Sequence, residues 1–387
     1  MQPFQFNTTT GLRVGSGRSI DTALEVSGKL GKKILFITDP GLKKLGLINE
    51  TVDALKKNSD VVIFDRVEAD PSLKTLMNVV EIGKDFNASG VIGFGGGSSM
   101  DVAKLCALLL GSDQNLEEAW GVANAKGPRT PLVLYPTTAG TGSEVTPISI
   151  ITVGGDEKKG VSSPILLPDL AILDPNLTLG LPAHITAATG IDAMVHAIEG
   201  YASKSINNNI MSKMLAKEAL KILGRSIKIA VFEGKNIQAR TDMLLGSMMA
   251  GMAFGNSPVA GVHALAYPLG GIYHIPHGLS NSLVLPHVLR FNIMDNNAAQ
   301  LYAELAPYLF PKMEVSTDNK DVSARFIENL ASLSKDLGLE QKLRGLNIPK
   351  DACKKLAKDS MKQTRLLINN PREITEKDAY NIYKSAW

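Results

Sequence analysis

Four residues between positions 192 and 277 have the types and spacing that could bind a metal ion. Asp192 and His196 are four residues apart in a helix-like segment, so their side chains would share one helix face. Apolar residues flank this pair, which indicates a buried helix, and a buried carboxylate is costly without a partner. His263 and His277, in GVHALAYPLGG and YHIPHGLSN, would add two imidazoles. Three nitrogens and one oxygen suit Fe²⁺ or Zn²⁺, with a position left open for substrate.

The same residues also have structural interpretations. An aspartate and a histidine one helical turn apart can form a surface or capping interaction. A lone histidine such as His184 or His287 is more often a hydrogen-bonded structural residue. His274 could be a ligand, a substrate contact or a support for the ligands. Spacing alone does not show that Asp192 and His263 meet in space.

Glycine- and hydroxyl-rich loops follow two apolar, strand-like runs. Gly95-Gly96-Gly97-Ser98 comes after GVIGF and before a helix-like segment. Glycines let the backbone approach a ligand, and the unpaired N–H groups of a helix N-terminus attract phosphate. We expect Ser98 or Ser99 to cap this helix. A plain capped turn is the alternative, but Thr137–Ser143 forms a second such loop after another strand, and the two together favour a nucleotide.

Asp39 ends the first strong strand-like run, in ILFITDP. A carboxylate there could accept hydrogen bonds from ribose hydroxyls and repel a 2′-phosphate, which favours NAD over NADP. The alternative is a turn in which Asp39 bonds the backbone before Pro40. The acidic residue precedes the glycine loop, so this is not the common GxGxxG arrangement.

These residues need elements to position them, and the first half of the chain alternates strand and helix patterns. Continuous apolar runs predict strands that are covered on both faces, as in a doubly wound parallel sheet. We also expect an edge strand or hairpin over Gln5–Val14, and a hairpin turn where Gly154–Gly155 precedes Lys158–Lys159. The predicted strands are Lys33–Thr38, Val61–Phe64, Gly90–Phe94, Pro131–Tyr135 and Leu170–Leu173, and the predicted helices between them include Leu42–Lys57 and Ser72–Phe86.

The pattern changes near Pro175–Pro182, after which helical periodicity dominates. We therefore predict an α/β domain over residues 1–180 and an all-helical domain over residues 181–387. A chain of 387 residues is long enough for two cores. The segments that read most clearly as helices are Asn209–Leu223, Ala239–Phe254 and Val322–Leu337.

Composition narrows the classes of partner. The net charge of +3 is small and evenly spread, so we expect neither nucleic acid nor an anionic membrane as a partner. Cys106 and Cys353 form no CxxC pair, which argues against a cysteine zinc site and a disulfide framework. The N-terminal stretch lacks the features of a secretory signal and no apolar run is long enough to cross a bilayer, so we expect a cytoplasmic protein.

Several long motifs resemble those of the iron-containing (group III) alcohol dehydrogenases. They are GGGSSMDVAK, PTTAGTGSEVTP, TAATGIDAMVHAIEGY and GVHALAYPLGGIYHIPHGLSNSLVLPHV, and a late NPR segment agrees with them. The resemblance implies a Rossmann-like dinucleotide-binding domain, then a helical metal-binding domain, and a homo-oligomer that is a dimer or larger. It implies metal ligands at Asp192, His196, His263 and His277, and cofactor contacts at Asp39, Gly96, Gly97, Ser98, Asp101, Thr137, Thr138, Thr146 and Lys158, or Lys159 if the register shifts by one.

One position departs from the family pattern. Many relatives carry another histidine four residues after the one that corresponds to His263, where this chain has Tyr267. That histidine is thought to bind substrate or relay a proton, and a phenol is a poorer base at neutral pH. We place His263, Tyr267, His274 and His277 among the catalytic candidates and leave the proton relay open.

The expected function is an NAD-dependent, metal-dependent alcohol dehydrogenase. It would interconvert a small alcohol, diol or hydroxy acid and its aldehyde or ketone by hydride transfer, with Fe²⁺ preferred to Zn²⁺ because of the resemblance. A hydroxyacid–oxoacid transhydrogenase on the same fold is the main alternative, and a metal-dependent non-redox enzyme is the third. Phe254, Tyr267 and Ile272 suggest a compact, mainly apolar substrate pocket.

Overall fold

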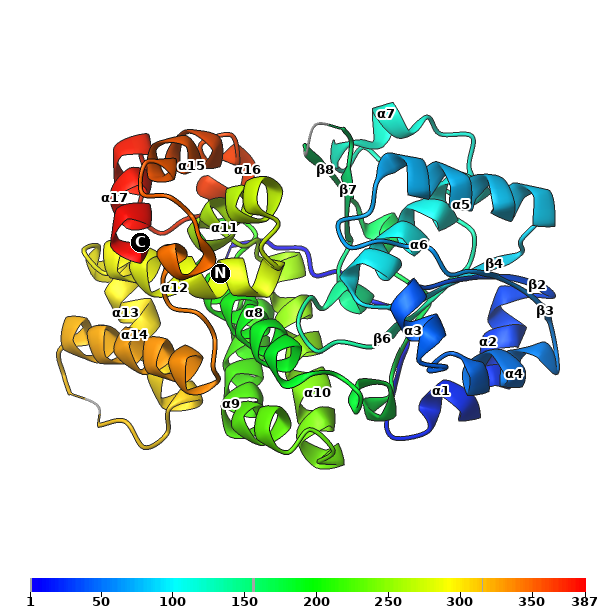
Figure 1. Cartoon of the computed structure of the whole chain (residues 1–387), viewed down its shortest axis with the longest axis horizontal. Coiled ribbons are helices and arrows are strands. Elements are labelled where there is room, and N and C mark those ends of the chain that lie inside the picture. Colours follow the sequence, from blue (N-terminus) through cyan, green and yellow to red (C-terminus); the bar gives the residue numbers. More distant parts are fainter. Residues whose placement is uncertain (1, 155–156, 315) are drawn as a thin grey trace. The chain divides into compact units, whose positions relative to one another are not determined.

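The chain forms two compact units. The computed structural model describes residues 2–154, 157–314 and 316–387. Residues 7–179 make up an α/β unit, and Gly180–Trp387 make up a helical unit together with the residues that precede Asn7. Figure 1 shows the elements of each unit, coloured along the sequence. The predicted fold class, an α/β part with a parallel sheet followed by an all-helical part, is confirmed.

A parallel sheet forms the centre of the α/β unit, and over the described residues it has six strands. Their order is β1 (Leu12–Val14), β9 (Leu170–Leu173), β6 (Leu132–Pro136), β4 (Gly90–Gly95), β2 (Lys33–Ile37) and β3 (Asp60–Phe64). Each strand is parallel to its neighbours. The five predicted strands are therefore present, with ends that differ by at most one residue. Because β2, β4 and β6 are adjacent, their carboxyl ends lie side by side.

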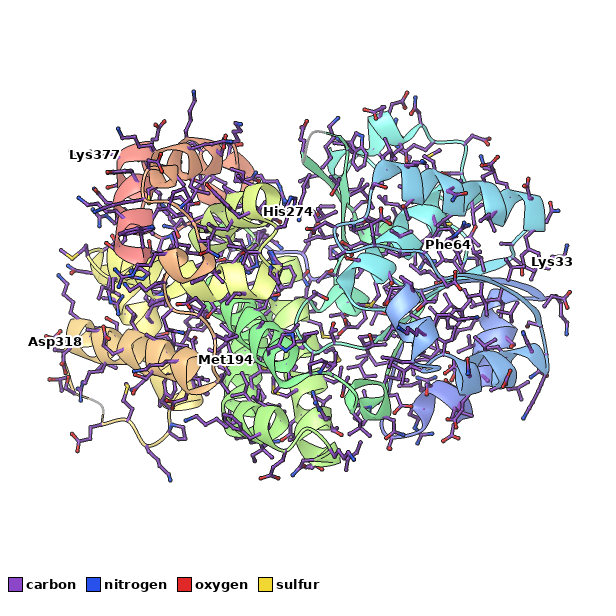
Figure 2. The ribbon with its side chains drawn as sticks, viewed as in Figure 1. Lys33, Phe64, Met194, His274, Asp318 and Lys377 are labelled. Carbon is purple, nitrogen blue, oxygen red and sulfur yellow. The ribbon has the colours of Figure 1, made fainter. Side chains whose placement is uncertain are left out.

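Helices cover both faces of this sheet. Figure 1 shows α1 (Arg18–Asp21), α2 (Ala23–Leu30) and α4 (Asn49–Lys56) on one side, and α5 (Leu73–Phe86) and α6 (Gly97–Gly111) on the other. Alternate residues of β2 point to opposite faces, so Phe36 packs with α2 and α4 while Leu35 packs with α5 and α6. Phe64, at the end of β3, is buried in the hydrophobic core between the sheet and the helices α5 and α6 (Figure 2).

Of two local predictions, one was wrong and one was confirmed. The segment Leu42–Lys57 is two helices, α3 (Pro40–Lys44) and α4, because Gly46 adopts a left-handed conformation (φ 69°) between them. In the segment Gln5–Val14 the edge strand is present as β1, which pairs with β9 at the edge of the sheet, and the alternative hairpin is not formed.

A smaller sheet accompanies the main one. β7 (Ile148–Thr152) and β8 (Lys158–Ser162) are antiparallel neighbours, and the two-residue strand β5 (Gly121–Val122) is parallel to β8. The predicted hairpin is thus present, although Gly155 of its turn lies outside the described residues. A short helix, α7 (Leu116–Ala119), precedes β5.

The helical unit has no strand among its described residues. Its first helix, α8, is almost entirely buried because nearly all of its residues are small or apolar, and Met194 at its centre is completely inaccessible (Figure 2). α8 packs against α9, α10 and α12. The unit consists of α8 (Ala183–Ala202), α9 (Ile210–Phe232), α10 (Ile237–Asn256), α11 (Gly261–Tyr273), α12 (His277–Asn292), α13 (Asn296–Leu309), α14 (Asn319–Asp336), α15 (Ala352–Ser360), α16 (Thr364–Leu367) and α17 (Glu376–Ala386).

The three helices predicted for this unit are present, and α9 extends nine residues beyond the predicted Leu223, to Phe232. Among the described residues, none of the helices combines the length and the apolar character needed to cross a membrane.

Candidate metal centre and nucleotide-binding loops

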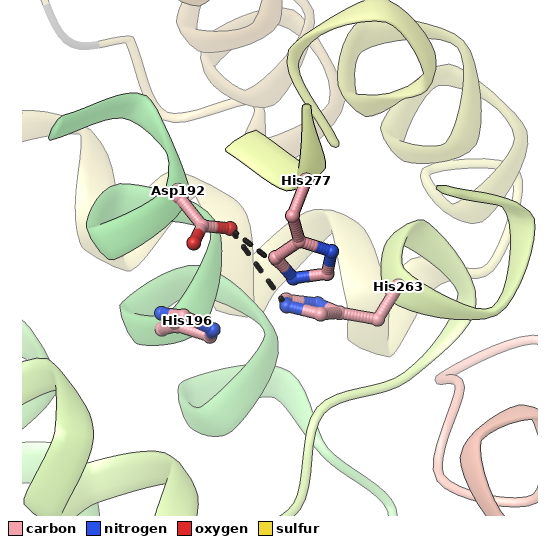
Figure 3. A group of neighbouring side chains, drawn as sticks. All are labelled: Asp192, His196, His263 and His277. Carbon is pink, nitrogen blue, oxygen red and sulfur yellow. Dashed lines mark ion pairs between the residues drawn. The ribbon is translucent and has the colours of Figure 1, made fainter. Parts of the chain in front are cut away.

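The four predicted metal ligands come together in the helical unit. Asp192 and His196 lie one turn apart on α8, His263 is in the first turn of α11, and His277 is the first residue of α12. One potential ligand atom from each of them lies within 4.8 Å of those of the others. Figure 3 shows the Asp192 carboxylate facing the imidazole rings of His263 and His277. The distant helix α8 and the consecutive helices α11 and α12 therefore supply one cluster.

The start of α12 lies directly against α8. A Cβ atom added to Gly278 would be 2.3 Å from the carbonyl oxygen of Ala188, so only glycine permits this approach. The contact brings His277, the preceding residue, next to the helix that carries Asp192. Glycine at this position thus helps to set the distance between ligands on two helices.

Burial and charge favour an ionised carboxylate in the cluster. Asp192, His196 and His263 are buried, whereas the side chain of His277 is 39% exposed. Burial alone would raise the pKa of Asp192, but the nearby imidazoles and a hydrogen bond from Asn281 outweigh it and hold that pKa below its ordinary value. His277 is therefore the most accessible of the four side chains.

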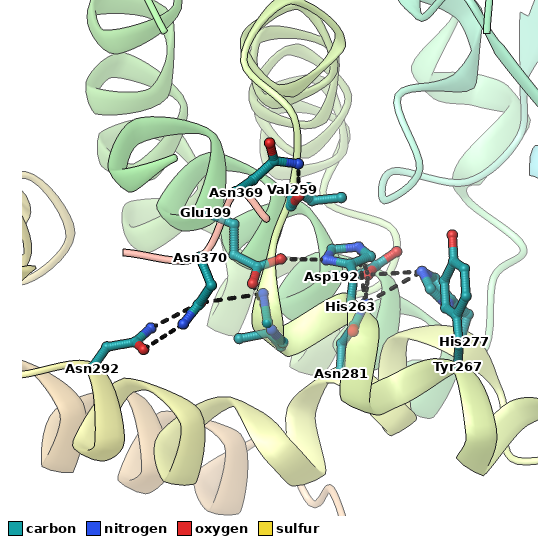
Figure 4. A network of polar contacts seen from close by, with 12 residues as sticks. Asp192, Glu199, Val259, His263, Tyr267, His277, Asn281, Asn292, Asn369 and Asn370 are labelled. Atoms are coloured by element: carbon teal, nitrogen blue, oxygen red, sulfur yellow. Dashed lines mark hydrogen bonds and ion pairs between the residues drawn. The ribbon is translucent and has the colours of Figure 1, made fainter. Parts of the chain in front are cut away.

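A divalent cation fits this set of donor atoms. The amide nitrogen of Asn281 donates to Asp192 Oδ1 (2.6 Å), and it lies 3.2 Å from His263 Nε2 and 3.3 Å from His277 Nε2 (Figure 4). Asn281 Oδ1 is buried without a hydrogen-bond partner among the described residues. One carboxylate oxygen and three imidazole nitrogens are ligands that Fe²⁺ and Zn²⁺ accept.

The predicted cofactor loops meet at the carboxyl ends of β2, β4 and β6 in the α/β unit. The glycine loop after β4 contacts the threonine loop after β6. A Cβ atom on Gly96 would lie 3.6 Å from Thr138 Oγ1, and one on Gly97 would lie 3.0 Å from Thr141 Cγ2. The backbone N–H of Thr137 donates to the carbonyl of Gly95 (3.0 Å). The two loops therefore form one continuous surface of backbone and hydroxyl groups.

The helix after the glycine loop begins two or three residues earlier than we predicted for a serine cap. The N-cap residue of α6 is Gly96, and it makes no side-chain capping bond. The expected capping role of Ser98 or Ser99 is therefore wrong, because both serines already lie in the first turn. Ser99 is buried behind Gly95, where an added Cβ atom would come within 2.6 Å of its hydroxyl. The first N–H groups of α6 have no side-chain cap and are suited to an anion.

A network of hydrogen bonds and one ion pair, centred on Asp101 and Lys104 of α6, connects this helix with the end of the threonine loop. Asp101 accepts hydrogen bonds from the Ser143 hydroxyl (2.7 Å) and the Ile150 N–H (2.9 Å). Lys104 Nζ lies 3.8 Å from the Asp101 carboxylate, and it donates to Ser143 Oγ (2.7 Å) and Thr146 Oγ1 (3.3 Å). These bonds tie α6 to the segment that follows the threonine loop.

Burial shifts the ionisation of this network. It raises the pKa of Asp101, and it raises the pKa of the nearby Glu144 to about 7. Burial also lowers the pKa of Lys104 to about 8, although both acidic side chains oppose that shift. The side chains of Asp101 and Thr146 form hydrogen bonds with other protein groups, which fits a role in holding the loops in place.

Asp39 has the capping role that one interpretation of the sequence predicted, and its carboxyl group also lies beside the glycine loop. It is the N-cap of α3, and its Oδ1 accepts a hydrogen bond from the N–H of Leu42 (3.0 Å). Its other oxygen would lie 3.5 Å from a Cβ atom on Gly95, so the carboxyl group is beside the glycine loop.

The two lysines predicted as alternative cofactor contacts are engaged with protein groups. Lys158, on β8, forms an ion pair with Asp70 (2.5 Å). Lys159 lies 3.7 Å from the carboxylate of Glu117, and its ammonium group lies over the ring of Trp120. Both side chains belong to the small sheet of the α/β unit.

Comparisons with known proteins cover nearly the whole chain. Residues 10–175 match the model of the iron-containing alcohol dehydrogenases, and residues 186–387 match the C-terminal model of the same family. The long-chain-alcohol dehydrogenase 1 of Geobacillus thermodenitrificans is 40% identical over 381 residues, which cover 97% of this chain and 94% of that protein. The chain belongs to the iron-containing alcohol dehydrogenase family. The predicted resemblance is therefore confirmed.

Solved structures agree with this assignment to the iron-containing alcohol dehydrogenases. The crystal structure of a 1,3-propanediol oxidoreductase superposes with a TM-score of 0.93 at 32% identity and covers 100% of both chains. A sulfoacetaldehyde reductase from Bifidobacterium kashiwanohense, solved in complex with NAD⁺, has a TM-score of 0.86 at 29% identity and covers 100% of this chain and 99% of that one.

Two further catalytic candidates are not part of the cluster. Tyr267 is one turn after His263 on α11. Its ring centroid is 5.9 Å from that of His277, and its hydroxyl accepts a long hydrogen bond (3.5 Å) from Arg365. His274 is the exposed C-cap of α11, in a left-handed conformation (φ 54°), and it is not among the four clustered ligands.

Sequence reasoning missed several residues that support the site. Glu199 bonds His263, Asn281 bonds Asp192, and Lys104 holds the threonine loop. Glu199 follows His196 by three residues on α8, so helical spacing could have indicated it. Asn281 follows His277 by four residues, and the same rule applies.

Proposed function

We propose that this protein is an NAD-dependent alcohol dehydrogenase that uses a divalent metal ion, Fe²⁺ in preference to Zn²⁺. The observation that carries the proposal is the cluster of Asp192, His196, His263 and His277, whose ligand atoms lie within 4.8 Å of one another in a member of the iron-containing family. The helical domain, residues 181–387, would hold the metal and substrate, and residues 1–180 would bind the dinucleotide.

The side chains of the cluster would give the substrate one direction of approach. A bound divalent ion would supply Lewis acidity toward the substrate oxygen. Asp192, His196 and His263 are buried and would hold the ion away from water, whereas His277 is half-exposed and borders the accessible side. The ring of Phe254 stacks on that of His196 (centroids 4.2 Å apart) and makes the surroundings apolar. An alcohol without charged groups suits such a pocket.

The loops of the α/β unit would bind NAD. The N–H groups at the start of α6 and the glycine loop would contact the diphosphate, and Asp39 would accept hydrogen bonds from ribose hydroxyls. A structural neighbour was solved with NAD⁺, which supports the choice of cofactor. The proposed cofactor residues are Asp39, Gly96, Gly97, Ser98, Thr137, Thr138 and Lys158, with Asp101 and Thr146 holding the loops in place.

Several finer assignments belong to the same proposal. The substrate would be a small primary alcohol or diol, and hydride would pass between its carbinol carbon and C4 of the nicotinamide. Tyr267 and His274 would contact substrate or help to move its proton. We also propose a cytoplasmic homo-oligomer, a dimer or larger, without nucleic acid or membrane partners.

The proposal is tested on protein purified without oxygen. We expect elemental analysis to find one Fe²⁺ or Zn²⁺ per chain and NAD-linked oxidation of at least one alcohol in a series from methanol to decanol and short diols. His263→Ala should lose both the metal and the activity. His184→Ala, an exposed histidine in the first turn of the same α8, should lose neither. A protein that binds metal normally but oxidises no alcohol with NAD would contradict the proposal.

A further inference from the structure

A buried glutamate lies behind the metal cluster. Glu199 is on α8, three residues after His196, and it is only 4% exposed. It is not one of the four clustered ligands, because its carboxylate faces the start of α11 (Figure 4). A buried carboxylate without compensating contacts is strongly disfavoured, so its contacts indicate what it does.

Each oxygen of Glu199 accepts one short hydrogen bond. Oε1 accepts from the backbone N–H of Val262 (2.6 Å), and Oε2 lies 2.6 Å from His263 Nδ1. The N-cap residue of α11 is Ala260, which has no capping side chain. Glu199 therefore caps α11 from another helix, where its negative charge is also favourable to the helix dipole.

The same contact decides which nitrogen of His263 carries the proton. A carboxylate oxygen accepts hydrogen bonds, so this contact favours Nδ1 of His263 as the donor. In a neutral ring, Nε2 is then left with a lone pair. Nε2 is the ring nitrogen that faces the cluster, since it lies 4.0 Å from Asp192 Oδ1.

We propose that Glu199 is a positioning residue for the metal site. It holds the proton of His263 on Nδ1, orients the ring, and presents Nε2 as a metal ligand. The inference rests on the proposed metal-binding function. It adds that the Glu199 carboxylate on α8 orients the metal ligand His263 on α11. Carboxylates that bind metal-ligating histidines in this way strengthen the ligand, and their loss typically weakens metal binding about 10–100-fold.

Glutamine at position 199 separates this role from capping. Its side chain has the size of glutamate but only one acceptor oxygen. If that oxygen keeps the bond to the Val262 N–H, the NH₂ group faces His263 Nδ1 and favours the tautomer with the proton on Nε2. The cap and the packing are then retained, while Nε2 loses its free lone pair.

The experiment compares Glu199→Gln with wild type and with Glu304→Gln. Glu304 is the matched control, because its carboxylate accepts hydrogen bonds from Tyr201 and Gln300 in the same unit and touches none of the four ligands. Zn²⁺ affinity is measured by competition with a chromophoric chelator. We expect Glu199→Gln to bind Zn²⁺ about 10–100-fold more weakly and Glu304→Gln to bind like wild type. The melting temperatures of the metal-free proteins report whether each variant folds.

A second measurement needs no variant at position 199. In ¹⁵N-histidine-labelled, Zn²⁺-loaded wild type, long-range ¹H–¹⁵N spectra should place the His263 proton on Nδ1, with assignment by comparison with His263→Gln. A proton on Nε2, or unchanged Zn²⁺ affinity in a folded Glu199→Gln, would overturn the inference. Wild type that binds neither Zn²⁺ nor Fe²⁺ would instead overturn the proposed function, so the two failures can be distinguished.

Discussion

In the proposed function, Asp39 would serve both as the cap of α3 and as a contact for the cofactor. One oxygen caps α3 through the N–H of Leu42, and the other lies beside the glycine loop. A change that removes both functions would not show which of them matters for the cofactor. Asparagine separates them, because its side-chain oxygen caps helices as well as that of aspartate but carries no charge.

We therefore expect Asp39→Asn to fold with an unchanged melting temperature and to accept NADP better. Removal of the negative charge should reduce repulsion of a 2′-phosphate, and the ratio of kcat/KM for NADP to that for NAD should rise by about tenfold, or about 1.4 kcal/mol. Steady-state kinetics with both cofactors measure the ratio. If the ratio stays at its wild-type value while the protein remains folded, Asp39 is a capping residue only.

The sequence supported the individual site residues to different degrees. Asp192 and His196 could be paired from their spacing on one helix. His263 and His277 could be joined to them only through the family resemblance, because periodicity does not report how three helices converge. Glu199 was missed because it reads as one more residue of a buried helix until its contact with His263 is seen.

At the scale of elements, the geometry of the four candidate metal ligands depends on how closely α12 approaches α8. Gly278 lies at the contact, where the neighbouring atoms belong to the backbone of Ala188. Backbone atoms cannot move aside as a flexible side chain can. A methyl group at this position must therefore separate the two helices or shift the first turn of α12, which carries His277.

Gly278→Ala should therefore destabilise the protein and weaken metal binding together. Overpacking of this kind costs about 1–3 kcal/mol, which denaturant-induced unfolding can measure. Gly28→Ala is the matched control: an added Cβ at Gly28, in α2, has no neighbour within 4 Å, so this variant should be neutral or more stable. A Gly278→Ala protein that keeps wild-type stability and wild-type Zn²⁺ affinity would refute the spacing role.

Elements were predicted well where they are long and periodic, and less well where a single residue interrupts them. The strands of the parallel sheet were recognised because residues covered on both faces give unbroken apolar runs. The division of Leu42–Lys57 was missed because Gly46 is tolerated inside a helical pattern, and only its positive φ shows the break. The cap of α6 was placed two or three residues too late because serine is a stronger sequence signal for a cap than glycine.

At the scale of the whole molecule, each unit contains one of the two tryptophans of the chain. Trp120 belongs to the α/β unit, and Trp387 belongs to the helical unit, where its ring nitrogen donates to the carbonyl of Ile348 (2.8 Å). Variants with a single tryptophan can therefore report the unfolding of one unit at a time. Both rings are partly buried, so unfolding should change their fluorescence.

We expect the two proposed ligands to stabilise different units. In Trp120→Phe, the remaining Trp387 should report a higher unfolding midpoint when Zn²⁺ is added. In Trp387→Phe, Trp120 should report a higher midpoint when NAD is added. A ligand at one hundred times its Kd adds about 2.7 kcal/mol to the native state that binds it. A Zn²⁺ effect seen only by Trp120 would contradict the assignment of the metal to the helical unit.

The order of the two units was predictable because strand–helix alternation ends near residue 180. The grouping of the residues before Asn7 with the helical unit was not predictable, since it depends on contacts between distant segments, such as the pair of hydrogen bonds between Gln5 and Asn207. Local patterns carry no information on such contacts.

The capping of α11 also has a consequence for the order of synthesis. The carboxylate that bonds the N–H of Val262 is made before α11, but the side chain that bonds the N–H of Gly261 belongs to Asn370, 109 residues later. A ribosome that has just produced His277 has made all four ligands, yet the first turn of α11 still lacks this partner. The first turn of α11 should therefore gain its second side-chain partner only after the segment that carries Asn370 has been made.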